Sequence, residues 1–119
     1  MTTQIKGIHL EHEHEHEHER SEEFGSAADM LKLLGDETRL RMIWALLDAE
    51  HSVNELAELV GAQPAGVSQH LAKLRLARLV RSRREGTRIF YVVDDVHVRR
   101  LIEEVVSHAG HVAGSGRAT

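Results

Sequence analysis

From Ser52 to Tyr91 the chain reads SVNELAELVGAQPAGVSQHLAKLRLARLVRSRREGTRIFY, and this stretch decides the fold. Ser52 and Glu55 form a capping-box pattern that opens a short helix, and Gly61 ends that helix. Pro64 suits the first turn of a second helix. The apolar residues that recur along one side of it are Val67, Leu71 and Leu74. Two short helices joined by a tight, glycine-containing turn are typical of a helix-turn-helix.

A β-hairpin is predicted directly after the second helix. Residues 79–84 and 87–93 have the pattern of two strands, and Glu85-Gly86 is the turn signal between them. A hairpin in this position is a wing. Residues 63–91 hold seven Lys and Arg residues against the single acid Glu85, a local net charge of +6. Such a local positive field suits a nucleic-acid-binding face, although the whole chain has a net charge of −4.

Short polar side chains on the second helix predict contacts with base edges, and the basic residues beside them predict contacts with phosphates. The alternative is a small α+β domain with a basic rim. The three arginines at the hairpin tip argue against it, since they suit a phosphate backbone or a minor groove. The candidate DNA-binding residues are Ser68, Gln69, His70, Lys73, Arg75, Arg83, Arg84, Thr87 and Arg88.

The remaining elements complete a fold that is mainly α with a small β-hairpin. A first helix is predicted from Ser26, with Asp29 as its capping partner, to Gly35. Asp36 caps a second helix, whose predicted buried face is Leu40, Ile43, Trp44 and Leu47. The last helix runs from Asp94 or Asp95 to about Gly110. We therefore predict a homodimeric winged helix-turn-helix of about five helices and a two-stranded wing. Its domain spans residues 26–111, between a disordered His/Glu-rich tail at 1–25 and a flexible tail at 112–119.

Four residues of the last helix segment form a candidate metal-ligand set: Asp95, His97, His108 and His111. His97 and His108 share a face of an α-helix but lie roughly 16 Å apart along it. A metal ion needs ligands at about 2 Å, so the two ends of one helix cannot share an ion. Two antiparallel copies can, because the first pair of one chain meets the second pair of its partner. The spacing therefore predicts a homodimer with two symmetry-related metal sites, unless the histidines recur by chance on a solvated face.

A His-Glu repeat precedes the first helix, and its histidines are His12, His14, His16 and His18, with His9 nearby. Three interpretations stay open. The repeat supplies extra ligands to the helical site, or it gathers metal at low affinity, or it is a purification tag or acidic disorder. Extra imidazoles would raise the coordination number toward the octahedron that nickel prefers. Three imidazoles and one carboxylate alone suit zinc or cobalt.

Composition limits the class of protein. A chain of 119 residues with 41% hydrophobic residues is expected to form one small domain. The chain has no cysteine, which excludes disulfides and thiolate metal sites. No apolar run approaches the ~18 residues of a membrane span, and no signal peptide is evident, so a cytoplasmic protein without a membrane partner is expected. An enzyme, such as a metal-dependent hydrolase, is not expected, because four protein ligands leave no open position for water.

The motifs within residues 26–111 resemble the ArsR/SmtB family of winged-helix bacterial metal sensors. The matching segments are Leu56-Ala57, Val67-Ser68-Gln69-His70-Leu71, Leu74-Arg75 and the wing from Gly86 to Tyr91. The DNA-reading half looks especially like actinobacterial nickel/cobalt sensors. The resemblance implies a homodimer that binds a palindromic operator in its metal-free form and binds it less tightly with metal. It also places a metal site on the last helix, at the four residues named above.

These considerations predict a metal-responsive DNA-binding regulator, a repressor in the implied scheme, that binds double-stranded operator DNA. The extra histidines and the resemblance favour nickel or cobalt as the metal, with zinc as the other candidate. The alternative is a winged-helix regulator whose DNA binding is controlled by a partner protein and not by its own metal site.

Overall fold

The computed structural model describes residues 20–118 of the chain. The chain divides after Lys32 into two units, and the unit that starts at Leu33 contains the core. The described part of the first unit is helical, and this first helix extends over residues 20–34. Ser26 was predicted to begin it. That prediction is wrong, because Gly25 does not interrupt the helix, which is continuous from residue 20 through Ser26. Gly35 follows the helix as predicted.

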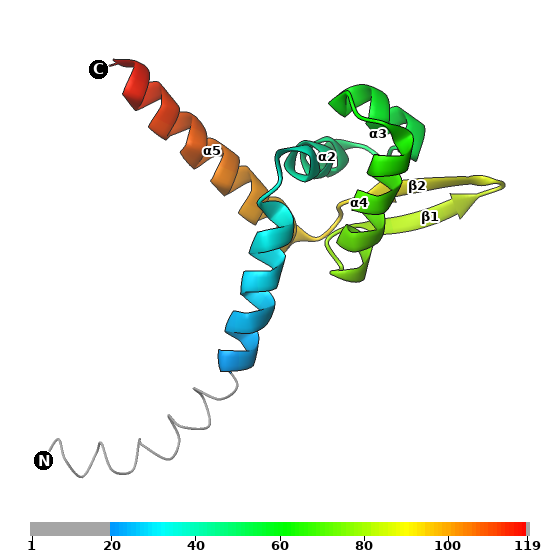
Figure 1. Cartoon of the computed structure of the whole chain (residues 1–119), viewed down its shortest axis with the longest axis horizontal. Coiled ribbons are helices and arrows are strands. Elements are labelled where there is room, and N and C mark those ends of the chain that lie inside the picture. Colours follow the sequence, from blue (N-terminus) through cyan, green and yellow to red (C-terminus); the bar gives the residue numbers. More distant parts are fainter. Residues whose placement is uncertain (1–19, 119) are drawn as a thin grey trace, which may run out of the picture. The chain divides into compact units, whose positions relative to one another are not determined.

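The second unit contains α2 (Glu37–Asp48), α3 (Val53–Val60), α4 (Pro64–Leu76), β1 (Arg81–Glu85), β2 (Arg88–Val92) and α5 (Val96–Ala118). Figure 1 shows α3 and α4 side by side, with the hairpin of β1 and β2 extending past them. The two strands are antiparallel, with Arg83 opposite Phe90 and Arg84 opposite Ile89. This order of elements confirms the predicted winged helix-turn-helix. In the described part of the chain, no helix is both long and apolar enough to cross a membrane.

The predicted caps explain where three helices begin. The Asp36 carboxylate accepts a hydrogen bond from the Arg39 backbone N–H at 3.0 Å, at the start of α2. Ser52 and Glu55 form the reciprocal capping box of α3, which ends at Gly61 in the left-handed conformation. Pro64 is the first residue of α4. Side-chain and backbone chemistry at these positions therefore sets the lengths of the helices that carry the turn.

One apolar core joins the elements of the second unit. Val67, Leu71 and Leu74 of α4 are fully buried, as the sequence predicted. The prediction for α2 was wrong at Trp44, whose side chain is 45% exposed. The buried face of α2 consists of Met42, Ile43, Leu46 and Leu47. Two overlapping apolar stripes run along this helix, and Met42 and Leu46 turn the buried face away from Trp44 by about a quarter of the circumference.

α5 extends further than the sequence predicted. It begins at Val96 and continues to Ala118, past the predicted end at Gly110. Neither Gly110 nor Gly114 adopts a positive φ, so neither ends the helix. Residues 112–118, predicted to be a flexible tail, are helical. The predicted tail of residues 1–25 falls mostly outside the described residues, and its described part, residues 20–25, is helical.

Candidate nucleic-acid interface and metal-binding residues

The outer face of α4 is exposed, because the buried residues Val67, Leu71 and Leu74 turn toward the core, and the one large apolar residue of the helix that does not is Leu76 at its end. Ser68, Gln69 and Lys73 lie on the exposed side. Leu76 shares the centre of this face with Gln69, seven residues earlier, and its side chain is 86% exposed. The sequence prediction did not include Leu76. The seven-residue spacing from Gln69 could have revealed it. The face offers one amide, one hydroxyl, one ammonium group and one large apolar side chain to a groove.

His70 lies at the margin of this face and links two helices. Its Nδ1 accepts a hydrogen bond from Arg39 Nε at 3.0 Å, and Arg39 Nη1 donates to the Leu33 carbonyl oxygen at 3.1 Å. The contact requires Nδ1 to be unprotonated. Arg39 also donates its backbone N–H to Asp36, and this hydrogen bond is the main reason why the pKa of the Asp36 carboxyl is lowered. His70 was predicted to contact DNA. Its ring also connects α4 to α2 through the hydrogen bond from Arg39.

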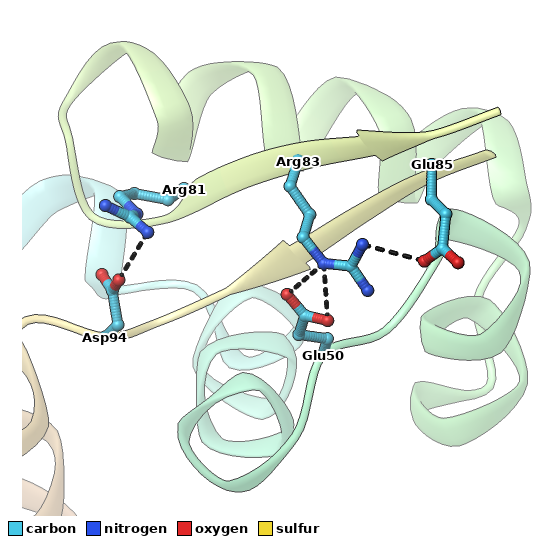
Figure 2. Close-up of polar contacts among 5 residues, drawn as sticks. All are labelled: Glu50, Arg81, Arg83, Glu85 and Asp94. Atoms are coloured by element: carbon cyan, nitrogen blue, oxygen red, sulfur yellow. Dashed lines mark hydrogen bonds and ion pairs between the residues drawn. The ribbon is translucent and has the colours of Figure 1, made fainter. Parts of the chain in front are cut away.

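The basic residues of the wing differ in how they are already paired. Arg83 Nε lies 2.8 and 2.7 Å from the two carboxylate oxygens of Glu50, and Arg83 Nη1 lies 2.9 Å from Glu85 Oε2 (Figure 2). Arg88 Nη2 is 3.9 Å from Glu55 Oε1. Arg84 forms no ion pair with any residue that the structure describes. The arginines of the wing are therefore not equivalent as candidates for phosphate contacts.

Arg75 lines a cleft and does not point along the centre of the α4 face. The cleft has a volume of about 560 Å³ and is bordered by the end of α4, the start of β1 and the residues before α5. Its charged lining residues are Arg75, Arg78, Arg81, Asp94 and Asp95. Arg81 Nη2 and Asp94 Oδ2 form an ion pair at 2.9 Å (Figure 2). The residue next to the candidate ligand Asp95 is thus bonded directly to the first residue of the wing.

Asp95 is the cap of α5. Its Oδ1 accepts hydrogen bonds from the backbone N–H groups of His97 at 2.8 Å and Val98 at 3.1 Å. Oδ2 makes neither of these bonds, so the carboxylate can coordinate a cation through that oxygen while it still caps the helix. The structure therefore gives Asp95 a role that the metal-ligand prediction did not include, and the two roles are compatible.

The three histidines lie on the continuous helix α5, and all of them are exposed. His97, His108 and His111 fall within about 60° of one another around the helix, but the first is separated from the others by three turns. Within the described part of the chain, no group of three or more ligand side chains could hold a metal ion. The predicted site takes two ligands from each of two chains, so it stays a prediction. The predicted ligands His9, His12, His14, His16 and His18 lie outside the described residues.

Apolar side chains occupy the same face of α5 as the histidines. Leu101, Val105 and Val112 are 37%, 45% and 58% exposed, and all lie within about 80° of His97 around the helix. Ile102 and Val98, on the adjacent face, pack against the core. An exposed apolar stripe at helical spacing is typical of a surface that packs against another helix.

An exposed polar face on the second helix of a helix-turn-helix, followed by an arginine-rich hairpin, defines a winged helix-turn-helix DNA-binding protein. The profile of the bacterial regulatory proteins of the arsR family matches residues 36–82, from the α2 cap to the second residue of β1. The chain belongs to this ArsR/SmtB family. It is a transcriptional regulator and not an enzyme.

Individual relatives support the assignment over most of the chain. The HTH-type transcriptional regulator KmtR of Mycobacterium tuberculosis is 54% identical over 88 residues, which cover 74% of this chain and 67% of that protein. The cadmium resistance transcriptional regulatory protein CadC homolog of Staphylococcus aureus is 33% identical over 90 residues, with 75% and 74% covered. The homodimeric winged helix-turn-helix DNA-binding domain Mb0332 of Mycobacterium bovis superposes with a TM-score of 0.70 at 30% identity, covering 76% of this chain and 84% of that domain.

Proposed function

We propose that the protein is a dimeric, metal-responsive repressor that binds operator DNA in its metal-free form and releases it when a divalent transition metal binds. The observation that carries this proposal is the arrangement of α5. Asp95 and His97 lie at one end of a continuous exposed face, and His108 and His111 lie at the other. The apolar residues between them give two antiparallel copies a surface to share.

The donor set fits a divalent transition metal. In the proposed dimer, the Asp95 carboxylate and the His97 imidazole of one chain join His108 and His111 of a second copy. When bound, the metal would supply a crosslink between the two copies of α5 and fix their register. Nickel or cobalt is the favoured ion, and zinc is the alternative. The name of the CadC relative, which refers to cadmium resistance, supports a response to divalent metals without selecting one.

The contacts at the start of α5 explain how a shift of this helix would be transmitted to the DNA-binding elements. Asp94, beside the candidate ligand Asp95, forms the ion pair with Arg81 at the start of β1. The Val93 backbone N–H donates to the Leu46 carbonyl at 3.0 Å, and Arg99 donates to the Leu47 carbonyl at the end of α2. A change in the register of α5 would therefore act on α2 and on the wing directly.

DNA contacts are proposed for Ser68, Gln69, His70 and Lys73 on α4, and for Arg75, Arg84, Thr87 and Arg88 as phosphate-side contacts. The exposed polar face of α4 supports base contacts from the first group. The absence of an ion pair to Arg84 within the described residues supports a phosphate contact by its guanidinium. Arg83 is not among these contacts, because two carboxylates already hold it.

The test is the response of operator binding to metal, measured by fluorescence anisotropy with nickel, cobalt and zinc in turn. We expect the metal to weaken DNA binding of the unmodified protein about 5- to 150-fold, as for a typical coupling of ~1–3 kcal/mol. His97→Ala and His108→Ala should keep the metal-free affinity and lose this response.

His51→Ala is a matched control, because His51 contacts the wing through its backbone N–H and carbonyl groups. Its response to metal should equal that of the unmodified protein. If His97→Ala and His108→Ala still release DNA when metal is added, the site on α5 is not the sensor. Removal of residues 1–19 tests the tail in the same assay. An unchanged ratio of nickel to zinc affinity would exclude the tail as a source of ligands.

A further inference from the structure

Three groups of the protein contact Arg83, in the middle of β1. Glu50, in the segment between α2 and α3, faces its Nε with both carboxylate oxygens, at 2.8 and 2.7 Å. Glu85 Oε2 lies 2.9 Å from Nη1, and the guanidinium stands 4.9 Å from the centre of the Phe90 ring. Figure 2 shows the Arg83 side chain directed toward Glu50 and Glu85 along the hairpin.

The charges in this cluster are arranged against a phosphate contact. Two carboxylates surround one guanidinium, so the cluster of Glu50, Arg83 and Glu85 has a net charge of −1. The hydrogen bond from Arg83 lowers the pKa of the Glu50 carboxyl below its ordinary value of 4.5, so Glu50 is ionised at neutral pH. A phosphate that approached Arg83 could use only the N–H groups that Glu50 and Glu85 leave free, and its charge would meet two carboxylates that already neutralise the guanidinium.

Glu50 is held at the base of the wing by the backbone that follows it. The His51 N–H donates to the Tyr91 carbonyl at 3.1 Å, and the Tyr91 N–H donates to the His51 carbonyl at 2.9 Å. These bonds attach the segment between α2 and α3 to the edge of β2. The Glu50 side chain is 35% exposed, and Arg83 is 49% exposed. The backbone beside Glu50 is therefore attached to the wing, and its carboxylate lies within hydrogen-bond distance of Arg83.

The neighbouring arginine has the opposite environment. Side chains alternate along a strand, so Arg84 points to the other face of the hairpin from Arg83. Among the described residues it has no carboxylate partner within ion-pair distance. β1 thus carries two arginines that are paired with carboxylates, Arg81 and Arg83, and one that is available, Arg84.

We propose that Glu50 is a positioning residue of the wing, which holds Arg83 against the hairpin and removes its charge from the set that contacts DNA phosphates. This inference revises the sequence prediction that Arg83 binds DNA. It rests on the proposed contact between the wing and the DNA backbone. It does not depend on the metal site.

The test is the salt dependence of DNA binding by the full-length, metal-free protein, using a labelled duplex of random sequence. The slope of log K against log of the salt concentration changes by about 0.9 for each DNA phosphate that the protein neutralises. Arg83→Gln should leave the slope unchanged. Glu50→Gln should make it steeper by about 0.9, because Arg83 is then held by Glu85 alone, through Nη1, and its remaining N–H groups can neutralise one more phosphate. The double variant should return to the original slope.

Arg84→Gln is the matched control, one residue away with the same change of charge, and it should flatten the slope by about 0.9. A flatter slope in Arg83→Gln would overturn the proposal, since Arg83 would then contact phosphate itself. An unchanged slope in Glu50→Gln would also overturn it, even if affinity fell, because loosening of the wing alone neutralises no further phosphate. An unchanged slope in Arg84→Gln would refute the phosphate contact proposed for Arg84, and the contrast between Arg84 and Arg83 with it. All these slopes are measured without metal, so none of the outcomes bears on the metal response.

Discussion

Among single residues, Arg78 adopts a backbone conformation that a residue with a Cβ disfavours. Its φ is 60°, and it is the only described non-glycine residue with a positive φ. The hydrogen bond from the Leu79 N–H to the Leu74 carbonyl, 2.9 Å long, closes the end of α4 around it. This is the position after a helix at which glycine is usually found, because a Cβ costs roughly 1–2 kcal/mol there.

Arg78→Gly is therefore expected to stabilise the protein. The gain should be at most about 1 kcal/mol, because glycine also makes the unfolded chain more flexible and offsets part of the relief. Urea unfolding followed by circular dichroism measures it. Arg75→Gly is the contrasting control, since Arg75 lies inside α4 and glycine there should destabilise by about 1 kcal/mol. A loss of stability in Arg78→Gly would mean that the Arg78 side chain makes contacts worth more than the strain.

At the scale of the element, the capping box of α3 predicts a dependence of stability on pH. The Ser52 N–H donates to Glu55 Oε1 at 2.8 Å, and this hydrogen bond is the main reason why the pKa of the Glu55 carboxyl is lowered from 4.5. A carboxyl whose pKa is lower in the folded state stabilises the fold above its ordinary pKa. The contribution is lost as the pH falls through the lower, folded value.

Glu55→Gln should therefore be less stable than the unmodified protein at pH 7, and the difference should shrink as the pH falls below 4.5. Thermal unfolding from pH 7 to pH 3 measures this. Glu58→Gln removes a charge from the same helix outside the capping box and should not show the converging curves of Glu55→Gln. A gap between Glu55→Gln and the unmodified protein that stays constant across this range would mean that the carboxylate does not act through the cap.

The same elements explain how far sequence reasoning could reach. Caps and glycines are local signals, so Asp36, Ser52, Gly61 and Pro64 located the helices of the turn without any knowledge of the tertiary structure. Periodicity was less reliable at Trp44, because two apolar stripes overlap on α2 and only packing selects between them. Glycine alone did not predict the end of α5, because a glycine ends a helix only where the backbone reverses its handedness.

In the candidate site, too, local features could be predicted from the sequence and contacts between distant residues could not. Exposure of the α4 residues could be inferred from the stripe on the opposite side of the helix. The contact between Glu50 and Arg83 could not, because the two residues are 33 positions apart in the sequence and only the fold brings them together. The second role of Asp95, as the cap of α5, could have been read from its position directly before the helix.

At the scale of the whole molecule, the proposed function requires a second copy of the chain. Leu101, Val105 and Val112 are exposed on the face of α5 that also carries His97 and His108. Opposite ends of one α5 lie several turns apart, so a metal site formed from both ends exists only if two copies pack along this face. The proposed metal site therefore requires that two copies pack through the apolar stripe of α5.

Leu101→Glu should convert the dimer to a monomer, because it places a carboxylate in the middle of the proposed interface. The fold should persist, since the buried Ile102 still anchors α5 to the core. Sedimentation equilibrium measures the oligomeric state, and calorimetric titration with nickel measures the metal site, whose affinity should fall as the dimer is lost. Val106→Glu is the matched control: Val106 is 38% exposed and Leu101 is 37% exposed, but they lie about 140° apart around α5. If Leu101→Glu remains a dimer that binds nickel normally, the two copies associate through another surface, and the pairing of Asp95 and His97 with His108 and His111 across it is wrong.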